Sequence, residues 1–307
     1  MSTVLGSVLQ WGWGLVGGPR PPSAPPQMPP LAPPPAWGPP AMPALQTPRP
    51  PGLVPLVGAP APQAASYAGT FDTGVACLPC LRGHASTGAT AAALADDAAQ
   101  AGDQEGAKAA VVQAAAEVTA FHVWDLTDAK IAATKPADLA VIQQALPSLA
   151  ASLEGIPLPP APVLGAYAAT TEAHRFAVSE EPSADDAREI AERIRPALRW
   201  MDEAERITLA PAALAAMPPE QRAAAAAASD HLREARHALA PEGGADVSPQ
   251  ALEQASAHLL AAAVALTPEV TPEQTAAMRQ RAEAAMERLD DHLMAHLAAG
   301  ARAEGGV

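Results

Sequence analysis

The amino-acid sequence predicts an all-α protein, an alanine-rich helical bundle that is built from two related helical units and follows an extended, proline-rich N-terminal arm. Three observations predict this fold class. From residue 85 onward the apolar residues recur with helical spacing, and no segment alternates well enough to be a strand. Before residue 75 the chain is dense in proline. A faint internal repeat with a constant offset of 83 residues relates two parts of the helical region.

The chain begins with an apolar segment, residues 1–18. Ser2 to Gly18 carries no charge and includes Trp11 and Trp13, but at about 17 residues with several glycines it is short for a bilayer span. No basic residues precede it, as they would in a signal peptide. We therefore expect this segment to bind a partner protein. A helical protein anchored in a membrane through residues 2–18 is an alternative, and membrane contact is a minor expectation.

Residues 19–74 form the arm, in which proline recurs at nearly every second or third position from Pro19 to Pro62. Proline fixes φ and removes a backbone donor, so this stretch favours extended polyproline II conformations. It is either a disordered linker or an arm that lies along a neighbouring subunit. In the second case Trp11, Trp13 and Trp37 are the apolar anchors.

Helix signals follow one another after the arm. Capping residues mark several starts: Ser183, Ser248 before Pro249, and Thr271 before Pro272. Glycine or proline marks most of the ends. The expected helices cover residues 85–101, 104–123, 136–153, 164–178, 188–206, 219–240, a stretch that begins at 249, and 272–300.

The internal repeat pairs turns as well as apolar positions. The matched pairs are Thr87 with Thr170, Val111 with Ile194, Leu126 with Leu209, Ile131 with Leu214, Pro136 with Pro219, Leu149 with Leu232, and Ile156 with Leu239. We therefore expect helical unit 1 at residues 75–157, helical unit 2 at 158–245 and a C-terminal helical hairpin at 246–307.

The clearest chemical signal is the spacing Cys77-x2-Cys80-x3-His84, which uses both cysteines of the chain. Two thiolates and an imidazole within one loop and the first turn of a helix match the ligand types of a structural zinc site. His174 is our candidate for the fourth ligand, because the repeat places its helix beside that of His84, and His122 is an alternative. A structural zinc would fasten the arm to the bundle.

The same residues allow two other interpretations. Cys77-Leu78-Pro79-Cys80 has the C-x-Pro-C form that thioredoxin-like redox enzymes carry at a helix N-terminus, but that fold presents the motif from strands, and none is predicted here. The alternative without function is a pair of ordinary buried cysteines or a local disulfide. In unit 2, Pro160, Val163 and Tyr167 occupy the three positions, so the unit closes without these ligands.

The remaining polar groups offer little chemistry. His292 and His296 are four residues apart on one helix, but Leu293 stands where a metalloprotease motif has glutamate, so they predict a solvated face. No nucleophile motif and no phosphate-binding glycine loop occurs. Residues 1–70 contain two of the nineteen basic residues, Arg20 and Arg49, and no acidic residue. The rest of the chain therefore has a net charge of −16. Such an acidic region repels phosphate, so nucleic-acid binding by the folded region is disfavoured.

The stretch from Cys77 to Thr87, with Arg206–Pro211 and Arg233–Leu239, resembles a set of uncharacterised helical proteins that have a C-x2-C-x3-H opening. These proteins are encoded in phage-like, prophage and archaeal genomes. The resemblance covers roughly residues 75–260. It implies a virus-like genomic context and no particular activity.

These observations lead to a functional expectation. We expect a non-enzymatic structural or adaptor protein of a larger assembly, a virion component such as a capsid, neck or tail accessory protein, whose arm docks on a neighbouring subunit. The chain would be an oligomer located in the virion or the cytoplasm. The alternatives are a metal-dependent or thiol-redox enzyme centred on Cys77 and Cys80, or the membrane-anchored protein described above.

Overall fold

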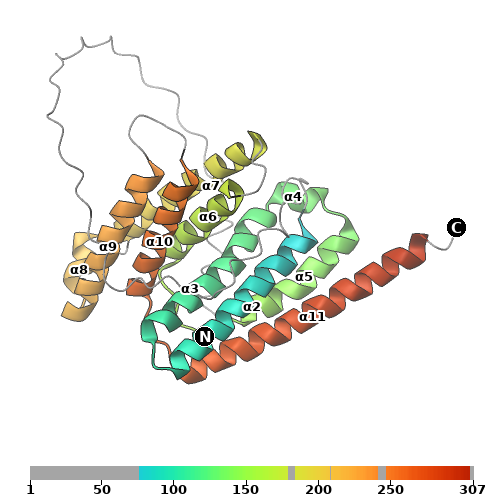
Figure 1. Cartoon of the computed structure of the whole chain (residues 1–307), viewed down its shortest axis with the longest axis horizontal. Helices are drawn as coiled ribbons and strands as arrows, with labels where there is room; N and C mark the ends of the chain where they lie inside the picture. Colours follow the sequence, from blue (N-terminus) through green and yellow to red (C-terminus); the bar gives the residue numbers. More distant parts are fainter. Residues whose placement is uncertain (1–75, 179–183, 208, 241–246, 305–307) are drawn as a thin grey trace, which may run out of the picture.

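The computed structural model describes residues 76–178, 184–207, 209–240 and 247–304. Within these ranges the chain forms ten α-helices and one short π-helical turn and contains no strand, as predicted (Figure 1). The apolar N-terminal segment, the arm with its tryptophans, and the expected cap at Ser183 lie outside the described residues. None of the described helices is both long and apolar enough to cross a membrane.

Unit 1 comprises α2 (Leu78–Gln100), α3 (Gln104–Ala120), the π-helical turn η2 (Phe121–Asp125), α4 (Asp128–Ala133) and α5 (Pro136–Ala151). The start of α2 corrects the sequence analysis, which placed the cysteines in a loop and began the helix at Ala85. Cys77 caps the helix, and Pro79 is tolerated because a residue in the first turn has no helical acceptor for its N–H. His84 therefore lies in the second turn.

Unit 2 comprises α6 (Ala161–Ala177), α7 (Ala184–Ile207), α8 (Pro211–Ala216) and α9 (Pro219–Leu239). Its helices fall where the offset of 83 residues places them. Adding 83 to the bounds of α4 gives the bounds of α8, and Pro136 and Pro219 begin the equivalent helices α5 and α9. The first two helices of each unit, α2 with α3 and α6 with α7, form the most extensive packing interfaces among the described elements.

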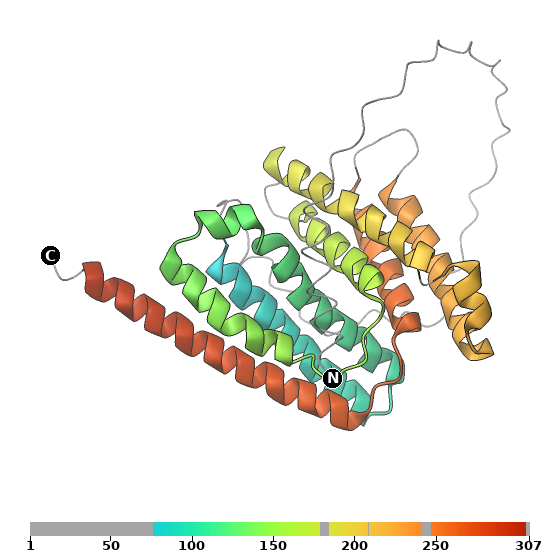
Figure 2. The same ribbon diagram turned by 180° about the vertical axis from the view of Figure 1, so that it is seen from behind.

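The last two helices, α10 (Pro249–Leu266) and α11 (Pro272–Glu304), do not form the expected C-terminal hairpin. Instead, α10 packs on α6 and α9 of unit 2, whereas α11 runs along α2 and α5 of unit 1 (Figures 1 and 2). The hairpin prediction was wrong because the apolar stripe of α10 packs on unit 2 and that of α11 packs on unit 1. Leu259 is fully buried on α10, and Met278 is fully buried on α11.

The linker between α10 and α11 is held against unit 1. The side-chain amide of Gln104, at the start of α3, donates to the Val270 carbonyl at 2.9 Å and accepts from the Val270 N–H at 3.3 Å. These two hydrogen bonds fix the point at which the chain leaves unit 2 and begins α11. Each unit thus gains one additional helix from the C-terminal region.

Alanine dominates the core, and it lets the helices approach closely at the cost of buried apolar area. One close approach joins α6 to α7, where the Trp200 indole lies over Gly165. A Cβ at Gly165 would lie 2.9 Å from Cδ2 of Trp200. Larger side chains fill the remaining space, and the fully buried ones include Leu81, Phe121, Ile142, Leu164, Met201, Leu232, Leu252, Leu259, Met278 and Leu289.

Candidate functional site

The cysteine motif forms the N-terminus of α2. Cys77 is the N-cap residue, and its Sγ accepts a hydrogen bond from the N–H of Cys80 at 3.1 Å. The two cysteines form a disulfide, with their Cα atoms 5.1 Å apart. Cys77 is 7% exposed and Cys80 is 1% exposed, whereas Pro79 between them is exposed. The disulfide therefore lies just beneath the surface, at the positive end of a helix dipole.

The residue before the disulfide is held from another part of unit 1. The N–H of Ala76 donates to Oγ1 of Thr134 at 2.7 Å, and this hydrogen bond is buried. Thr134 follows α4 directly and is 58 residues away in sequence. The entry of the chain into the disulfide is thus fixed by α4 as well as by the helix cap.

His84 lies one turn after Cys80 on the same face of α2, and side chains on a helix tilt toward its N-terminus. The imidazole is almost fully buried and makes an edge contact with the ring of Phe121, with the ring centroids 5.8 Å apart. Its Nδ1 donates to Oε2 of Glu117 on α3 at 2.9 Å. A polar side chain is therefore buried immediately behind the disulfide, with a carboxylate as its partner.

Glu117 extends this pair into a buried ionic network between the two units. Its second carboxylate oxygen accepts from Arg175 on α6, and the same guanidinium donates to Glu172 one turn earlier. Glu117 is 6% exposed and Glu172 is 2% exposed. With His84 protonated, two cations balance two carboxylates, as buried charges require.

Two opposing effects set the pKa of His84. Burial lowers the pKa, but the charge of Glu172 and the hydrogen bond and charge of Glu117 outweigh burial and raise it above the ordinary value of 6.5. For Glu117, burial raises the pKa, but Arg175 and His84 together lower it below 4.5. Both shifts favour an imidazolium beside a carboxylate.

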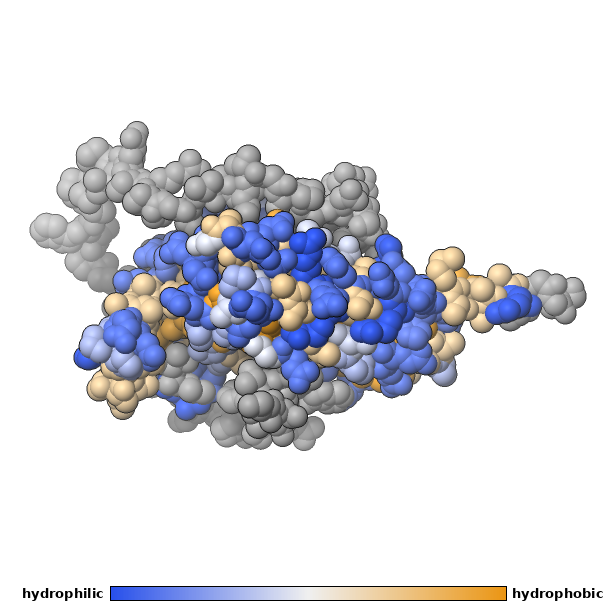
Figure 3. Space-filling model, turned by 90° about the horizontal axis from the view of Figure 1, so that it is seen from below, coloured by the Kyte–Doolittle hydropathy of each residue, from blue (hydrophilic) through white to orange (hydrophobic). Residues whose placement is uncertain are grey.

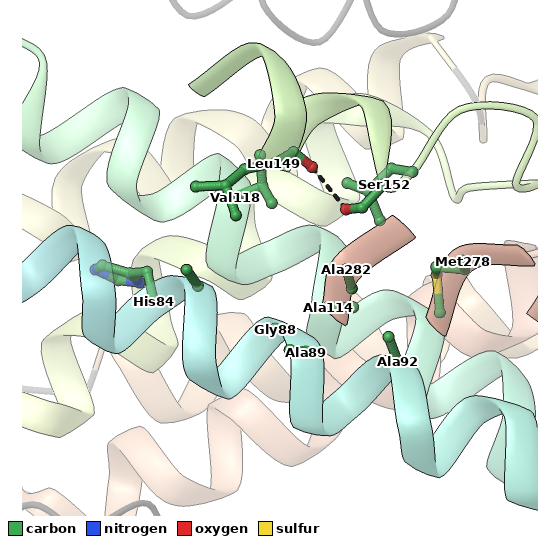
Figure 4. Close-up of a pocket in the computed structure, with 12 residues that line it drawn as sticks. His84, Gly88, Ala89, Ala92, Ala114, Val118, Leu149, Ser152, Met278 and Ala282 are labelled. Atoms are coloured by element: carbon green, nitrogen blue, oxygen red, sulfur yellow. Dashed lines mark hydrogen bonds between the residues drawn. The ribbon is translucent and has the colours of Figure 1, made fainter. Parts of the chain in front are cut away.

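A small cavity adjoins the site between α2, α3, α5 and α11 (Figure 4). Its volume is about 20 Å³, room for about one water molecule, and its walls are mainly apolar. His84 lies at the end nearest the start of α2, and Met278 lies toward the other end. The Ser152 hydroxyl at its edge already donates to the Leu149 carbonyl at 2.6 Å. This cavity cannot hold an organic substrate, so exchange chemistry at the disulfide would take place at the protein surface.

The structure does not bring the proposed zinc ligands together. Cys77 and Cys80 are bonded to each other, His84 faces Glu117, and His174 is half-buried near the charge of Glu253. Among the described residues no three His, Cys, Asp or Glu side chains converge in a way that could hold a metal ion. Zinc binding by the reduced cysteines with His84 and His174 stays a prediction.

The other histidines of the sequence analysis lie elsewhere. His122 is in the π-helical turn, where burial lowers its pKa and its Nε2 makes no hydrogen bond within the described structure. On α11, Nε2 of His296 pairs with Asp138 of α5 at 2.8 Å, so it links two helices instead of sharing an ion with His292.

Sequence reasoning missed the partners of His84. The spacing of Glu172 and Arg175 on one face of α6 was visible, and so was Glu117 in an otherwise alanine-rich stretch. A single acid within an apolar helical stripe is a useful signal, because it must find a partner once the stripe is buried. The identity of that partner depends on how the helices pack.

Comparison with known proteins gives no further guide, since the chain matches no protein-family model, no curated protein and no solved structure.

Proposed function

We propose that the chain catalyses thiol–disulfide exchange through Cys77 and Cys80, with thiols or dithiols as substrates. The observation that carries this proposal is a disulfide at a helix N-terminus with a buried histidine, paired with Glu117, one turn after Cys80. The proposal departs from our expectation of a non-enzymatic protein. It develops the redox alternative. A thioredoxin-like fold presents the cysteine motif from strands, whereas here the motif lies at the capped N-terminus of α2.

The repeat supports a functional role for these residues. At the offset of 83 residues the counterparts of Cys77, Cys80, His84 and Glu117 in unit 2 are Pro160, Val163, Tyr167 and Trp200. Unit 2 forms the same helices with apolar and aromatic side chains at these positions. The cysteines and the ion pair are therefore not needed to build the helical unit, and burying charges is costly in itself.

The reaction proceeds by two displacements. A substrate thiolate attacks Sγ of Cys77, the less buried of the two residues, and the bond to Cys80 breaks with the electron pair on Cys80. The second substrate thiolate then attacks the substrate sulfur, and Cys77 leaves as a thiolate. The substrate loses two electrons and becomes a disulfide, and the chain becomes a dithiol. A second substrate, itself a disulfide, reoxidises the chain by the same two displacements in reverse.

Two features of the site assist these steps. The N–H of Cys80 and the N-terminus of α2 stabilise negative charge on Cys77, which makes Cys77 a good leaving group in the second displacement. We assign His84, whose pKa is raised by Glu172 and Glu117, as the acid that supplies a proton to the Cys80 thiolate. Glu117 and Arg175 position the imidazole.

Stopped-flow oxidation of dithiothreitol by the full-length chain tests this assignment. We expect the Cys77→Ser and Cys80→Ser variants to lose the reaction. His84→Asn should slow it by about 100- to 10,000-fold, the usual contribution of a general acid. The matched control is His237→Asn, since His237 is exposed on α9 and should leave the rate unchanged.

Two results would count against the redox role. One is a disulfide that dithiothreitol does not reduce in the folded chain. The other is one tightly held zinc ion in the reduced protein that is lost in Cys80→Ser together with thermal stability, which would support the structural zinc site instead.

One observation favours a second function, that of an assembly protein. The C-terminal end of α11 extends beyond the bundle, and the face of it seen in Figure 3 is mainly apolar, with a hydrophilic residue near the tip. Met294 is 67% exposed and Leu297 is 63% exposed, and at a spacing of three residues they are neighbours on the helix surface. We propose that this end docks on a neighbouring subunit. The arm, which we expected to do so, lies outside the described residues.

Sedimentation velocity at rising protein concentration tests the docking proposal. The native chain should self-associate, and the double variant Met294→Glu/Leu297→Glu should remain monomeric with an unchanged melting temperature. Ala226→Glu, an exposed position on α9, is the control and should associate like the native chain. A native chain that is monomeric throughout would count against this function.

A further inference from the structure

A pair of histidines joins α9 to α10 in unit 2, far in sequence from the cysteine motif. Nδ1 of His231 lies 3.3 Å from Nδ1 of His258, and the two ring centroids are 5.5 Å apart. Each histidine precedes a fully buried leucine, Leu232 or Leu259. Because these leucines fix both helices in the core, the two imidazoles are held next to each other, with their ring planes tilted by 36°.

When both imidazoles are neutral, only one of the two facing Nδ1 atoms can carry a proton. Both atoms that face each other are Nδ1, so a hydrogen bond forms only if one of them carries a proton and the other presents its lone pair. Protonation of both rings would place two positive charges in contact. Burial and the charge of His258 lower the pKa of His231, and Asp230 and Glu234 on α9 oppose this shift only in part. Histidine binds metals through the lone pair of a neutral imidazole.

The separation of the two nitrogen atoms fits a shared ion. Zinc–nitrogen bonds of about 2.0–2.1 Å in tetrahedral geometry place two ligand nitrogens about 3.3–3.4 Å apart. The structure has the two Nδ1 atoms 3.3 Å apart before any ion is added. An ion would therefore take the place of the shared proton without moving either helix.

We propose that His231 and His258 bind one divalent transition-metal ion of the zinc class through their Nδ1 atoms. Water molecules complete the coordination, since no third protein ligand of the described chain converges on the pair. Asp230 and Glu234, one and three residues from His231, add negative charge beside the ion, although the Asp230 carboxylate also accepts from Arg233 at 2.8 Å. The ion would link α9 to α10, and the site does not depend on Cys77 or Cys80.

Isothermal titration with zinc chloride tests the site. The full-length Cys77→Ser/Cys80→Ser protein is used, so that zinc bound by reduced cysteines does not contribute. We expect one ion per chain and a higher melting temperature when zinc is present. His258→Asn and His231→Asn should each weaken binding by more than about tenfold, since loss of an outer partner alone costs about 10- to 100-fold. His237→Asn, on the same helix but exposed, should bind like the parent protein.

A second measurement needs no histidine variant. Zinc should shift the Nδ1 resonances of both His231 and His258 in a long-range nitrogen–proton NMR spectrum and leave those of His237 in place. Absence of zinc binding by the cysteine-free protein at millimolar zinc would overturn the proposal, as would unchanged affinity in folded His258→Asn or NMR shifts at other histidines only.

Discussion

Replacement of Arg175 by Met is expected to lower the free energy of unfolding by about 3–5 kcal/mol, the cost of removing one partner from a buried ion pair. Arg175 pairs with both Glu117 and Glu172, and the side chains of these two acids are only 8% and 3% exposed. Without the guanidinium, His84 alone faces two buried carboxylates. Methionine keeps much of the side-chain volume, so the loss of stability would come from the missing charge and not from a new cavity.

Urea unfolding monitored by circular dichroism measures this loss, and Arg233→Met is the matched control. Arg233 also pairs with an acid on its own helix, Asp230, but the two side chains are 67% and 68% exposed. Such a pair contributes about 0–1 kcal/mol. Equal losses of unfolding free energy in the two variants would contradict the expectation that the buried pairs of Arg175 with Glu117 and Glu172 matter more to stability than an exposed pair.

The charge explanation has two further consequences for Arg175→Met. Adding Glu172→Gln should recover part of the lost stability, because it removes one of the unpaired charges. The pKa of His84 should rise further, since the repulsion between Arg175 and the imidazolium is gone. An NMR titration of His84 measures this shift. A fall in its pKa would show that the variant disrupts the packing around the site instead.

Gly165→Ala is expected to destabilise the protein by about 1–3 kcal/mol, although alanine favours a helix more than glycine does. The added Cβ would lie 2.9–3.1 Å from three atoms of the Trp200 ring, which is closer than carbon atoms pack. Trp200 is buried and cannot withdraw easily. The first two helices of unit 2 would have to separate, and their packing would loosen along α6 and α7.

The control for this variant is Gly300→Ala near the end of α11, where a Cβ would meet nothing within 4 Å. There the substitution should leave stability unchanged or raise it by up to about 1 kcal/mol, because only helix propensity changes. Thermal and urea unfolding of the two variants should thus give shifts of opposite sign. A stabilised Gly165→Ala protein would mean that α6 and α7 are farther apart than described.

Local signals made much of the fold predictable. Caps and first-turn prolines act within a few residues, so the starts of α10 and α11 at Pro249 and Pro272 followed from the residues before them. The repeat offset predicted the matching helices of the two units, because local start signals such as Pro136 and Pro219 stand at equivalent positions. The start of α2 was misplaced because the cysteine motif was interpreted as a loop, whereas Cys77 caps a helix that begins at Leu78.

The site was only half predictable. Cys77, Cys80 and His84 are close in sequence, and their shared helix face follows from helical geometry. Glu117 is 33 residues from His84, and Arg175 is a further 58 residues from Glu117, so their meeting depends on the packing of α2, α3 and α6. The pairing of His231 with His258 depends likewise on α9 lying against α10.

The sequence by itself determined the helices, their order and the duplication, because hydrogen bonds and caps within a helix depend on neighbouring residues. Only the tertiary structure decided which buried charges balance one another and that α10 and α11 pack on different units. The physical reason is that apolar stripes fit many partners, whereas a buried ionic group is stable only beside the particular group that compensates it.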